Sequence, residues 1–598
     1  MTSLPPGLVA LVRILPRLLL PPAAAYLSLQ ACCLFDFLKF PGPLRTLIYI
    51  GSVPVTFTVY VLYAWYRDGR QAALRGAVLP PQMAHERLGA LDKLAALMRN
   101  FRSGYLAEFF EIECEKNGQT MNMRILCENR VFTTEPEYIK AMLVTQFNSF
   151  AKGDLLRDQL HSSLGTGVFN SDGDVWRFHR SMSRPFFSKD RVIDFENFEK
   201  HAEDAVNQTK ARLREGYPID FQDMVSRFTL DSATTFLFGK DVCSLSAGLV
   251  YPPSSPLSKD PKITNHPANL FADAFAAALI ASATRAHFGH LWRLIGGEFW
   301  EDRVQKHMRV CFEFIDPLLQ HALAKKEALK SRGALGDEKG NMEAQERESL
   351  LEHLVKYTDD RKVLRDESLN IMIAGRDTTA ATLTFAIYML SQHPDVLARL
   401  REEILTKLGS SRRPTHDDMK DMKYLRAVIN ETLRLYPPVP LNVRTSTEGT
   451  VWPPVNDGSS FYIPPGTSTA YSVFLMQRRK DLWGPDADIF DPDRFIDERL
   501  HKYLTPNPFI FLPFNAGPRI CLGQQFAYNE VSYFLIRLLQ SFSSVSLDME
   551  TQHMPPADWA QAKGRKAVEK VVMRSHLTMY VENGLWVKMT EACDAESA

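Results

Sequence analysis

The sequence predicts a mainly α-helical protein with a small β portion, preceded by an N-terminal transmembrane anchor. Six stretches carry apolar residues at the three- and four-residue spacing of a helix, namely 194–214, 304–330, 366–392, 395–408, 421–436 and 524–541. Four shorter stretches are typical of strands: 121–132, 440–448, 460–463 and 577–589. Near the N-terminus, a run of twenty-one uncharged residues is long enough to cross a bilayer.

The uncharged run extends from Thr46 to Tyr66 and ends in a cluster of aromatic residues. At about 1.5 Å per residue, a helix of this length spans roughly the 30 Å of a hydrocarbon core. Aromatic residues favour the membrane interface, and the arginines that follow at 67, 70 and 75 favour the cytosolic side. We therefore expect residues 1–75 to anchor the chain and residues 76–598 to form one large domain in the cytosol.

An earlier stretch, Leu18 to Phe35, is also uncharged but is interrupted by Pro21 and Pro22. It predicts either the first arm of a membrane hairpin or an amphipathic helix that lies in the interface. A cleaved signal peptide is the alternative, but the span after residue 46 lacks a small-residue cleavage site and is too long for a signal sequence.

Two polar or Pro/Ser-rich stretches, 244–268 and 331–349, are expected to be long surface loops. Within the last strand-like stretch, Asn583 and Gly584 stand between apolar runs, and this pair predicts a β-hairpin. No composition shift after residue 80 indicates a second domain boundary.

Composition excludes several functional classes. The chain carries 70 Lys and Arg against 70 Asp and Glu, so no global field attracts nucleic acid. Its eight cysteines contain no C-x-x-C pair, which argues against a structural zinc site, and they are too sparse for a disulfide framework. No repeat of fixed period is present.

The segment from Phe514 to Gly523 surrounds Cys521 with glycines and distinguishes it from the other cysteines. Its glycines can adopt backbone angles that other residues avoid, so that amide hydrogens can turn toward the Cys521 sulfur. A buried free cysteine in a Gly/Pro loop is the alternative reading. The segment resembles the haem-binding signature F-x-x-G-x-R-x-C-x-G of the cytochrome P-450 family, with matches at Phe514, Gly517, Arg519, Cys521 and Gly523.

This resemblance implies that Cys521 is the thiolate ligand of the iron in haem b, the expected cofactor. It also implies that Arg519 pairs with a haem propionate and that Phe514 shields the sulfur from water. Trp176 and Arg180, four residues apart, match the family's W-x-x-x-R, and Arg444 matches another propionate-binding position.

Glu431 and Arg434 share one helical face and can pair, although an exposed pair is the usual meaning of this spacing. They resemble the family's E-x-x-R motif, and Arg494 matches its later arginine. The resemblance implies a buried structural clamp in which all three charges are mutually satisfied. Gln477 departs from the pattern, because the family usually has histidine there.

Residues 374–379, Ala-Gly-Arg-Asp-Thr-Thr, interrupt an apolar helical stretch with charge. A solvated surface turn would be the plain interpretation. The segment resembles the family's oxygen-activation sequence, which implies that Thr378 holds the oxygen species and its water while Asp377 relays protons to it.

The whole pattern, over roughly residues 85–590, resembles fungal family members that hydroxylate alkanes and fatty acids. It implies insertion of one oxygen atom of O₂ into a lipophilic substrate, with polycyclic aromatic or other xenobiotic hydrocarbons as the alternative. A haem-binding sensor or electron carrier is the alternative from another class. Residues 274–283, Val439 and Leu441 would line the substrate pocket.

No G-x-G-x-x-G motif follows a strand, so we expect electrons from a separate NADPH–cytochrome reductase, with cytochrome b5 as a second candidate partner. The expected location is the endoplasmic reticulum membrane, with the catalytic domain on the cytosolic side.

Overall fold

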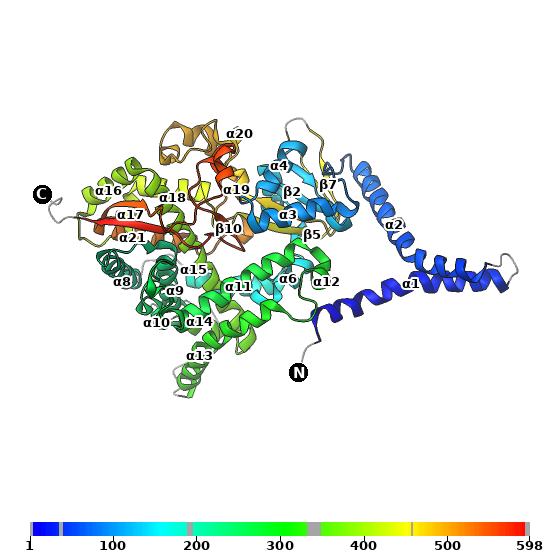
Figure 1. The fold of residues 1–598 in the computed structure, drawn as a ribbon, viewed down its shortest axis with the longest axis horizontal. Helices are drawn as coiled ribbons and strands as arrows, with labels where there is room; N and C mark the ends of the chain where they lie inside the picture. The colour runs from blue at the N-terminus through cyan, green and yellow to red at the C-terminus, as the bar shows by residue number, and fades with distance from the viewer. Residues whose placement is uncertain (1–3, 35–39, 188–194, 332–348, 456–457, 593–598) are drawn as a thin grey trace.

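The computed structural model describes residues 4–34, 40–187, 195–331, 349–455 and 458–592 (Figure 1). Figure 1 shows a helical body with small sheets, from which two long helices project. The fold is mainly α with a small β portion, as the sequence predicts. Residues 332–348 of the expected loop 331–349 lie outside the described residues.

All six predicted helices form, with ends within a few residues of the expected ones. They are α8 (Phe195–Arg214), α13 (Arg303–Ser331), α15 (Arg361–Gln392), α16 (Pro394–Leu408), α18 (Lys423–Leu435) and α21 (Gln524–Ser541). Helix α15 begins where the Asp360 side chain accepts the amide N–H groups of residues 362 and 363. Helix α18 ends before Pro437, because proline disfavours helical backbone in the residue that precedes it.

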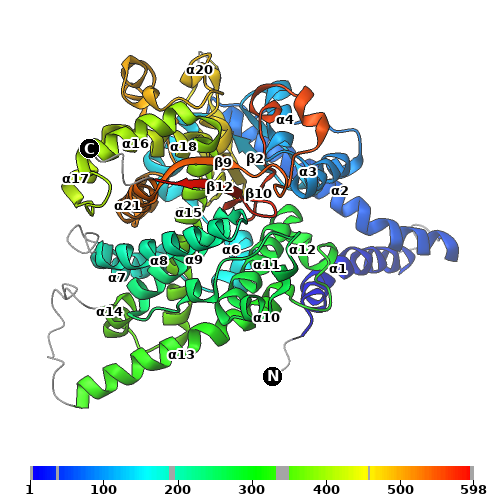
Figure 2. The same cartoon turned by 60° about the vertical axis from the view of Figure 1, so that its left-hand side comes forward.

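Fifteen further helices complete the described part of the chain: α1 (Pro6–Leu34), α2 (Gly42–Leu74), α3 (Leu91–Ser103), α4 (Glu108–Asn117), α5 (Pro136–Lys140), α6 (Asp154–Leu164), α7 (Gly173–Ser183), α9 (Phe221–Phe238), α10 (Pro261–Thr264), α11 (Pro267–His287), α12 (Trp292–Ile295), α14 (Leu350–Tyr357), α17 (His416–Asp421), α19 (Val473–Met476) and α20 (Lys480–Trp483). Helix α15 runs through the middle of the body, and α9, α18 and α21 pack against it (Figure 2). The expected loop 244–268 holds only short helical turns, including α10.

The β portion consists of four small sheets. The largest has the order β1 (Thr120–Asn122), β2 (Arg130–Thr133), β8 (Ser468–Ser472), β5 (Leu441–Ser446) and β3 (Phe150–Ala151). The others are β4 (Ile219–Asp220) with β12 (Trp586–Glu591) and β9 (Phe542–Leu547), β6 (Thr450–Trp452) with β7 (Phe461–Ile463), and β10 (Met573–Ser575) with β11 (Met579–Val581). Only the β2–β8 pairing is parallel among the described strands.

Two strand predictions need correction. The stretch 121–132 is two antiparallel strands, β1 and β2, rather than one. The hairpin predicted at Asn583 and Gly584 is wrong: the turn forms, with positive φ at both residues, but β11 pairs with β10 while β12 pairs with β9 and β4. Two side chains hold the start of β12 away from β11. Asp220 accepts the Leu585 N–H at 3.0 Å, and Gln552 accepts the Trp586 N–H.

The projecting helices α1 and α2 are both long and apolar enough to cross a membrane, and almost none of their apolar surface is buried. They pack against each other, with the rings of Tyr26 and Tyr49 6.2 Å apart. The N-terminal end of α1 contacts the body, where the Gly7 N–H donates to the Phe299 carbonyl at 2.8 Å. Helix α11 is a third candidate span by composition, but 39% of its apolar window is buried inside the body.

Candidate active site

A cavity of about 600 Å³ lies inside the body, with α15 and the loop before α21 among its walls. Eight of the residues predicted for the site line this one cavity: Trp176, Arg180, Thr378, Arg444, Phe514, Arg519, Cys521 and Gly523. These residues come from helices α7 and α15, from strand β5 and from the loop before α21. The fold therefore brings together segments more than three hundred residues apart.

The loop before α21 holds its cysteine through backbone geometry. Asn515 and Gly517 have φ values of +63° and +69°, and a Cβ at Gly517 would lie 1.9 Å from the Leu143 carbonyl oxygen. Only glycine fits there, which explains why this position carries it. The Cys521 N–H donates to the Phe514 carbonyl at 3.0 Å and closes the loop.

Cys521 is exposed to the cavity. Burial raises the pKa of the thiol above its ordinary value, and a hydrogen bond from the Gly523 amide and the positive charge of Arg180 offset only part of that rise. The amide contact agrees with the role expected of the second glycine, because hydrogen bonds to a sulfur ligand stabilise its thiolate form. The hydrogen bond and the charge of Arg180 thus favour the thiolate, whereas burial favours the neutral thiol. The charge of a bound metal cation would have to outweigh the effect of burial.

Four cationic side chains line the cavity near this loop: Lys152, Arg180, Arg444 and Arg519. The Asp172 carboxylate reaches this group and accepts from Arg519 at 2.8 Å. Burial, reinforced by Arg444, lowers the pKa of Arg519 to about 10. Burial and the two neighbouring guanidinium groups also lower the pKa of Lys152 well below its ordinary value. The three guanidinium groups outnumber the Asp172 carboxylate, so the region carries net positive charge whether or not Lys152 is protonated.

This charge excess fits haem b, which carries two propionates, and the thiol of Cys521 fits its iron. Trp176 adds a flat apolar surface, with the Arg519 guanidinium 4.5 Å from the centre of its ring. Lys152 and Asp172 were missed by the sequence reasoning, because neither stands in a recognisable motif. Only the folding of the chain places them beside Arg444 and Arg519.

The two residues expected to handle oxygen and protons are placed differently. Thr378 lines the cavity, and its hydroxyl donates to the Ala374 carbonyl at 2.6 Å. Asp377 is not among the described residues that line the cavity, and its carboxylate pairs with Arg376 at 3.0 Å. Residues 373–375, 378 and 379 of α15 line the cavity, so the part of the helix that carries Arg376 and Asp377 faces away from it.

The predicted clamp forms as a buried cluster outside the cavity. Arg434 makes a two-pronged pair with Glu431, with both N–O distances 2.7 Å, and neither side chain is exposed to solvent. The Arg494 Nε atom lies 3.7 Å from Glu431. Backbone carbonyls at positions 477, 483 and 487 accept further guanidinium hydrogens. The Asp486 carboxylate, 2.9 Å from Arg494, supplies the second negative charge, so that two arginines face two carboxylates and their burial is tolerated.

Gln477 connects the backbone next to this clamp to a neighbouring segment. Its side-chain amide donates to the carbonyls of Leu433 and Arg434, at 2.9 Å each, and its oxygen accepts the Leu512 N–H at 2.8 Å. The side chain therefore ties the end of α18 to the segment that leads into the cysteine loop. This residue, which departs from the family's usual histidine, supplies both donors and an acceptor.

The expected pocket segment 274–283 is only partly confirmed. Ser282 and Ala283 line the cavity, whereas Phe275, Ala278 and Leu279 pack into a hydrophobic core. Val439 and Leu441 both line the cavity, as expected.

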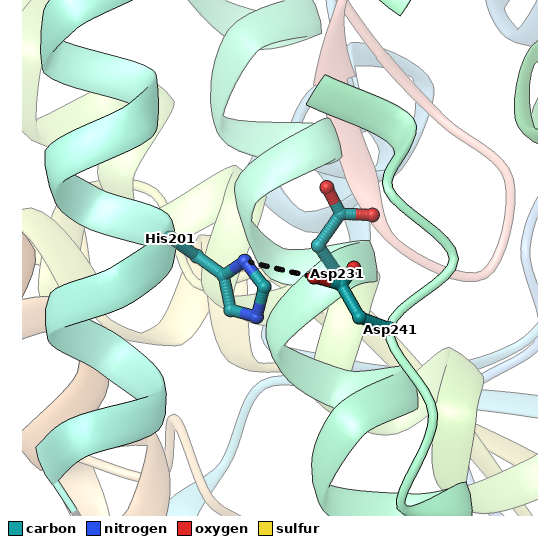
Figure 3. A group of neighbouring side chains, drawn as sticks. All are labelled: His201, Asp231 and Asp241. Atoms are coloured by element: carbon teal, nitrogen blue, oxygen red, sulfur yellow. Dashed lines mark ion pairs between the residues drawn. The ribbon is translucent and has the colours of Figure 1, made fainter. Parts of the chain in front are cut away.

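A separate cluster lies between α8 and α9 (Figure 3). The side chains of His201, Asp231 and Asp241 bring possible ligand atoms within 4.8 Å of one another. Both carboxylates are already occupied, because amide groups of residues 244–245 donate to Asp231 and Lys200 donates to Asp241 at 2.6 Å. We assign this cluster a structural role in holding the chain that follows α9.

Comparison with known proteins agrees with this geometry. A family model described as Cytochrome P450 matches residues 95–567. The chain is 38% identical over 456 residues to cytochrome P450 52A1 of Candida tropicalis, covering 74% of this chain and 78% of the relative. It is 33% identical over 515 residues to cytochrome P450 52-E3 of Starmerella bombicola, covering 83% and 92%.

A third relative is named for its activity. The chain is 35% identical over 480 residues to cytochrome P450 monooxygenase himC of Aspergillus japonicus, covering 80% of this chain and 79% of the relative. Residues 95–567, which the family model matches, include the cysteine loop and the clamp. The chain belongs to the cytochrome P450 family, and it is a haem-dependent monooxygenase.

Proposed function

We propose that the protein hydroxylates long-chain alkanes or fatty acids at the endoplasmic reticulum membrane. Electrons would come from a separate NADPH–cytochrome reductase, with cytochrome b5 as a second donor. The observation that carries the proposal is a single cavity that combines Cys521, a cationic cluster and apolar walls. The resemblance of the sequence to fungal alkane and fatty-acid hydroxylases supports the choice of substrate.

When bound, haem b supplies the iron chemistry that activates O₂, and a thiolate ligand favours cleavage of the O–O bond. In the proposal, Cys521 provides that thiolate. Arg180, Arg444 and Arg519 hold the two propionates together with Lys152. Phe514, whose ring lies 5.1 Å from that of Tyr528, covers the cysteine loop with apolar surface and limits the access of water.

Thr378 is the proposed proton-holding group on the cavity wall. Its hydroxyl hydrogen is directed to the Ala374 carbonyl, so the lone pairs of its oxygen can accept hydrogen bonds from water in the cavity. Asp377 can relay protons to Thr378 only when its carboxylate leaves Arg376. Opening of this ion pair is therefore part of the proposed proton path.

The proposed arrangement at the membrane follows from the two projecting helices. Residues 1–75 form the anchor and 76–598 the catalytic domain. Arg67, Arg70 and Arg75, at the end of α2, favour a cytosolic position for that domain. An apolar cavity near a bilayer can draw substrates that concentrate in lipid.

Reconstituted full-length holoprotein with a reductase tests the proposal. Dodecane, dodecanoic acid and pyrene would each be supplied with NADPH, and products identified by mass spectrometry. Hydroxylated dodecane or dodecanoic acid is the expected result. Oxidation of pyrene with no product from either aliphatic compound would replace the proposed substrate class by polycyclic hydrocarbons.

A further inference from the structure

The cavity holds a second set of charged groups, away from the cationic cluster around Cys521. Among the described residues that line it, the other arginines are Arg130, at the start of β2, and Arg574, on β10. In the proposed function the cationic cluster holds the haem propionates, so a fatty-acid carboxylate that enters the cavity would need Arg130 or Arg574 as its partner, because an unpaired carboxylate is costly to desolvate.

Arg130 is already neutralised by Glu128. Its Nη2 and Nε atoms donate to the Glu128 carboxylate at 2.8 and 3.2 Å, and its Nη1 donates to the His287 carbonyl at 2.9 Å. All three guanidinium nitrogens are thus engaged. The pair is mostly buried, with side-chain exposures of 11% and 22%, so solvent screens it only in part.

His290 makes further contacts with the Glu128 carboxylate. The backbone N–H and the ring Nδ1 of His290 contact its Oε1 atom at 3.1 and 2.8 Å. Burial alone would raise the pKa of Glu128, but the hydrogen bonds from His290 and Arg130 outweigh it and hold the pKa at about 2. The carboxylate therefore stays ionised, and it remains a competitor for any anion that approaches Arg130.

Arg574, on β10, is neutralised in the same way by Glu582, the residue that follows β11. Its Nη2 and Nε atoms donate to Glu582 at 2.9 and 3.2 Å, and its Nη1 donates to the Gly104 carbonyl at 2.8 Å. The two histidines of the lining add no positive charge near neutral pH, because burial lowers the pKa of His287 and of His576 to about 4.

We propose that the substrate region selects uncharged long-chain molecules over carboxylates, and that Glu128 is the residue that sets this preference. The inference rests on the proposed function and narrows it, from alkanes or fatty acids to alkanes, primary alcohols and esters. An anionic substrate would have to displace Glu128 or Glu582 from its arginine. An uncharged chain of the same length needs no cationic partner, so both ion pairs can stay closed when it binds.

The test compares ligands that differ in charge but hardly in size. Equilibrium binding of radiolabelled dodecanoate, methyl dodecanoate and dodecane to the full-length holoprotein would be measured at pH 8, where the free acid is ionised in water. Product formation would be followed in parallel. We expect dodecanoate to bind at least about tenfold more weakly than its methyl ester, which corresponds to about 1.4 kcal/mol. This comparison needs no variant.

The variant Glu128→Gln releases Arg130 without changing the size of the side chain. It should raise the affinity for dodecanoate about tenfold and leave that for dodecane unchanged; Glu582→Gln tests the second arginine in the same way. Glu137→Gln, on α5 and outside the described cavity lining, makes the same change of net charge and should alter neither affinity.

Equal binding of acid and ester by the unmodified protein would overturn the inference, as would an unchanged dodecanoate affinity in Glu128→Gln. Failure of the proposed function looks different: none of the three aliphatic compounds would then bind or yield a product. Binding of dodecane and ester but not of acid supports both.

Discussion

Glu530 on α21 gives a prediction whose size follows from its surroundings. Its side chain is fully buried, and its Oε1 atom accepts the Ser232 hydroxyl at 2.6 Å. Burial raises the pKa of this carboxyl from 4.5 to about 8, and contacts with Ser232 and Thr379 offset only part of that effect. We predict that Glu530→Gln, which keeps the size and the hydrogen-bonding capacity, stabilises the protein increasingly as pH rises.

The sign follows from proton linkage. A group whose pKa is higher in the folded state binds its proton more tightly there, so its stabilising contribution is complete below pH 4.5 and is lost as pH rises toward 8. Each pH unit in that interval costs about 1.4 kcal/mol. Close to pH 8 part of the folded population is already ionised, so the loss between pH 6 and 8 is about 2 kcal/mol.

Urea unfolding of the holoprotein, followed by circular dichroism at pH 6, 7 and 8, measures this quantity. The free energy of unfolding of Glu530→Gln, minus that of the unmodified protein, should grow by about 2 kcal/mol across the series. Glu352 is the control: burial would raise its pKa, but hydrogen bonds from Lys325 and Ser349 lower it instead. The effect of Glu352→Gln should therefore be constant over this range. A difference for Glu530→Gln that does not change with pH would refute the reasoning.

Four further predictions concern the ligand, the cavity wall, the clamp and the anchor. Cys521→Ser should abolish the red-shifted carbon monoxide band of a thiolate-ligated haem, whereas Cys311→Ala, in the core, should keep it; a retained band in Cys521→Ser would exclude this residue as the ligand. Thr378→Ala should bind haem and substrate normally but divert NADPH-derived electrons to peroxide, so unchanged coupling of NADPH to product would remove Thr378 from the proton path. Gln477→Leu should lower the free energy of unfolding by about 2–4 kcal/mol, because two carbonyls and one amide lose their buried partner; a loss below 1 kcal/mol, measured by urea unfolding, would contradict this role. Deletion of residues 1–75 should weaken membrane association in a flotation assay and preserve haem incorporation, and a deletion variant unable to bind haem would show that the catalytic domain begins earlier.

Local patterns predicted the parts of the site that depend on short segments. The cysteine loop and the Glu431–Arg434 pair are set by backbone geometry and by helical spacing, so neighbouring residues already contain the information. The turn at Asn583 and Gly584 was also local and does form, but the choice of partner for each strand depends on distant groups such as Asp220.

Contacts between distant segments could not be predicted in this way. Lys152 belongs to the cationic cluster only because the loop before α6 reaches strand β5, where its ammonium donates to the side chain of Asn442 at 3.3 Å. Asp377 was expected to relay protons to Thr378 because residues 374–379 resemble the family's oxygen-activation sequence, yet its carboxylate accepts from Arg376. In both cases the direction in which a side chain points decides its contacts, and a sequence motif does not give that direction.

The attachment of the projecting helices to the body has a mechanical consequence. Helix α1 meets the body at Phe299, whereas α2 meets it through the packing of Ala72 on Tyr462 and a hydrogen bond from Asn129 to Asp68. A body tethered by a single linker could tumble freely at the membrane surface. With α1 and α2 inserted in a bilayer, two separated points of attachment would restrict a rigid body to rocking about the line that joins them, and the domain would keep one face turned toward the lipid.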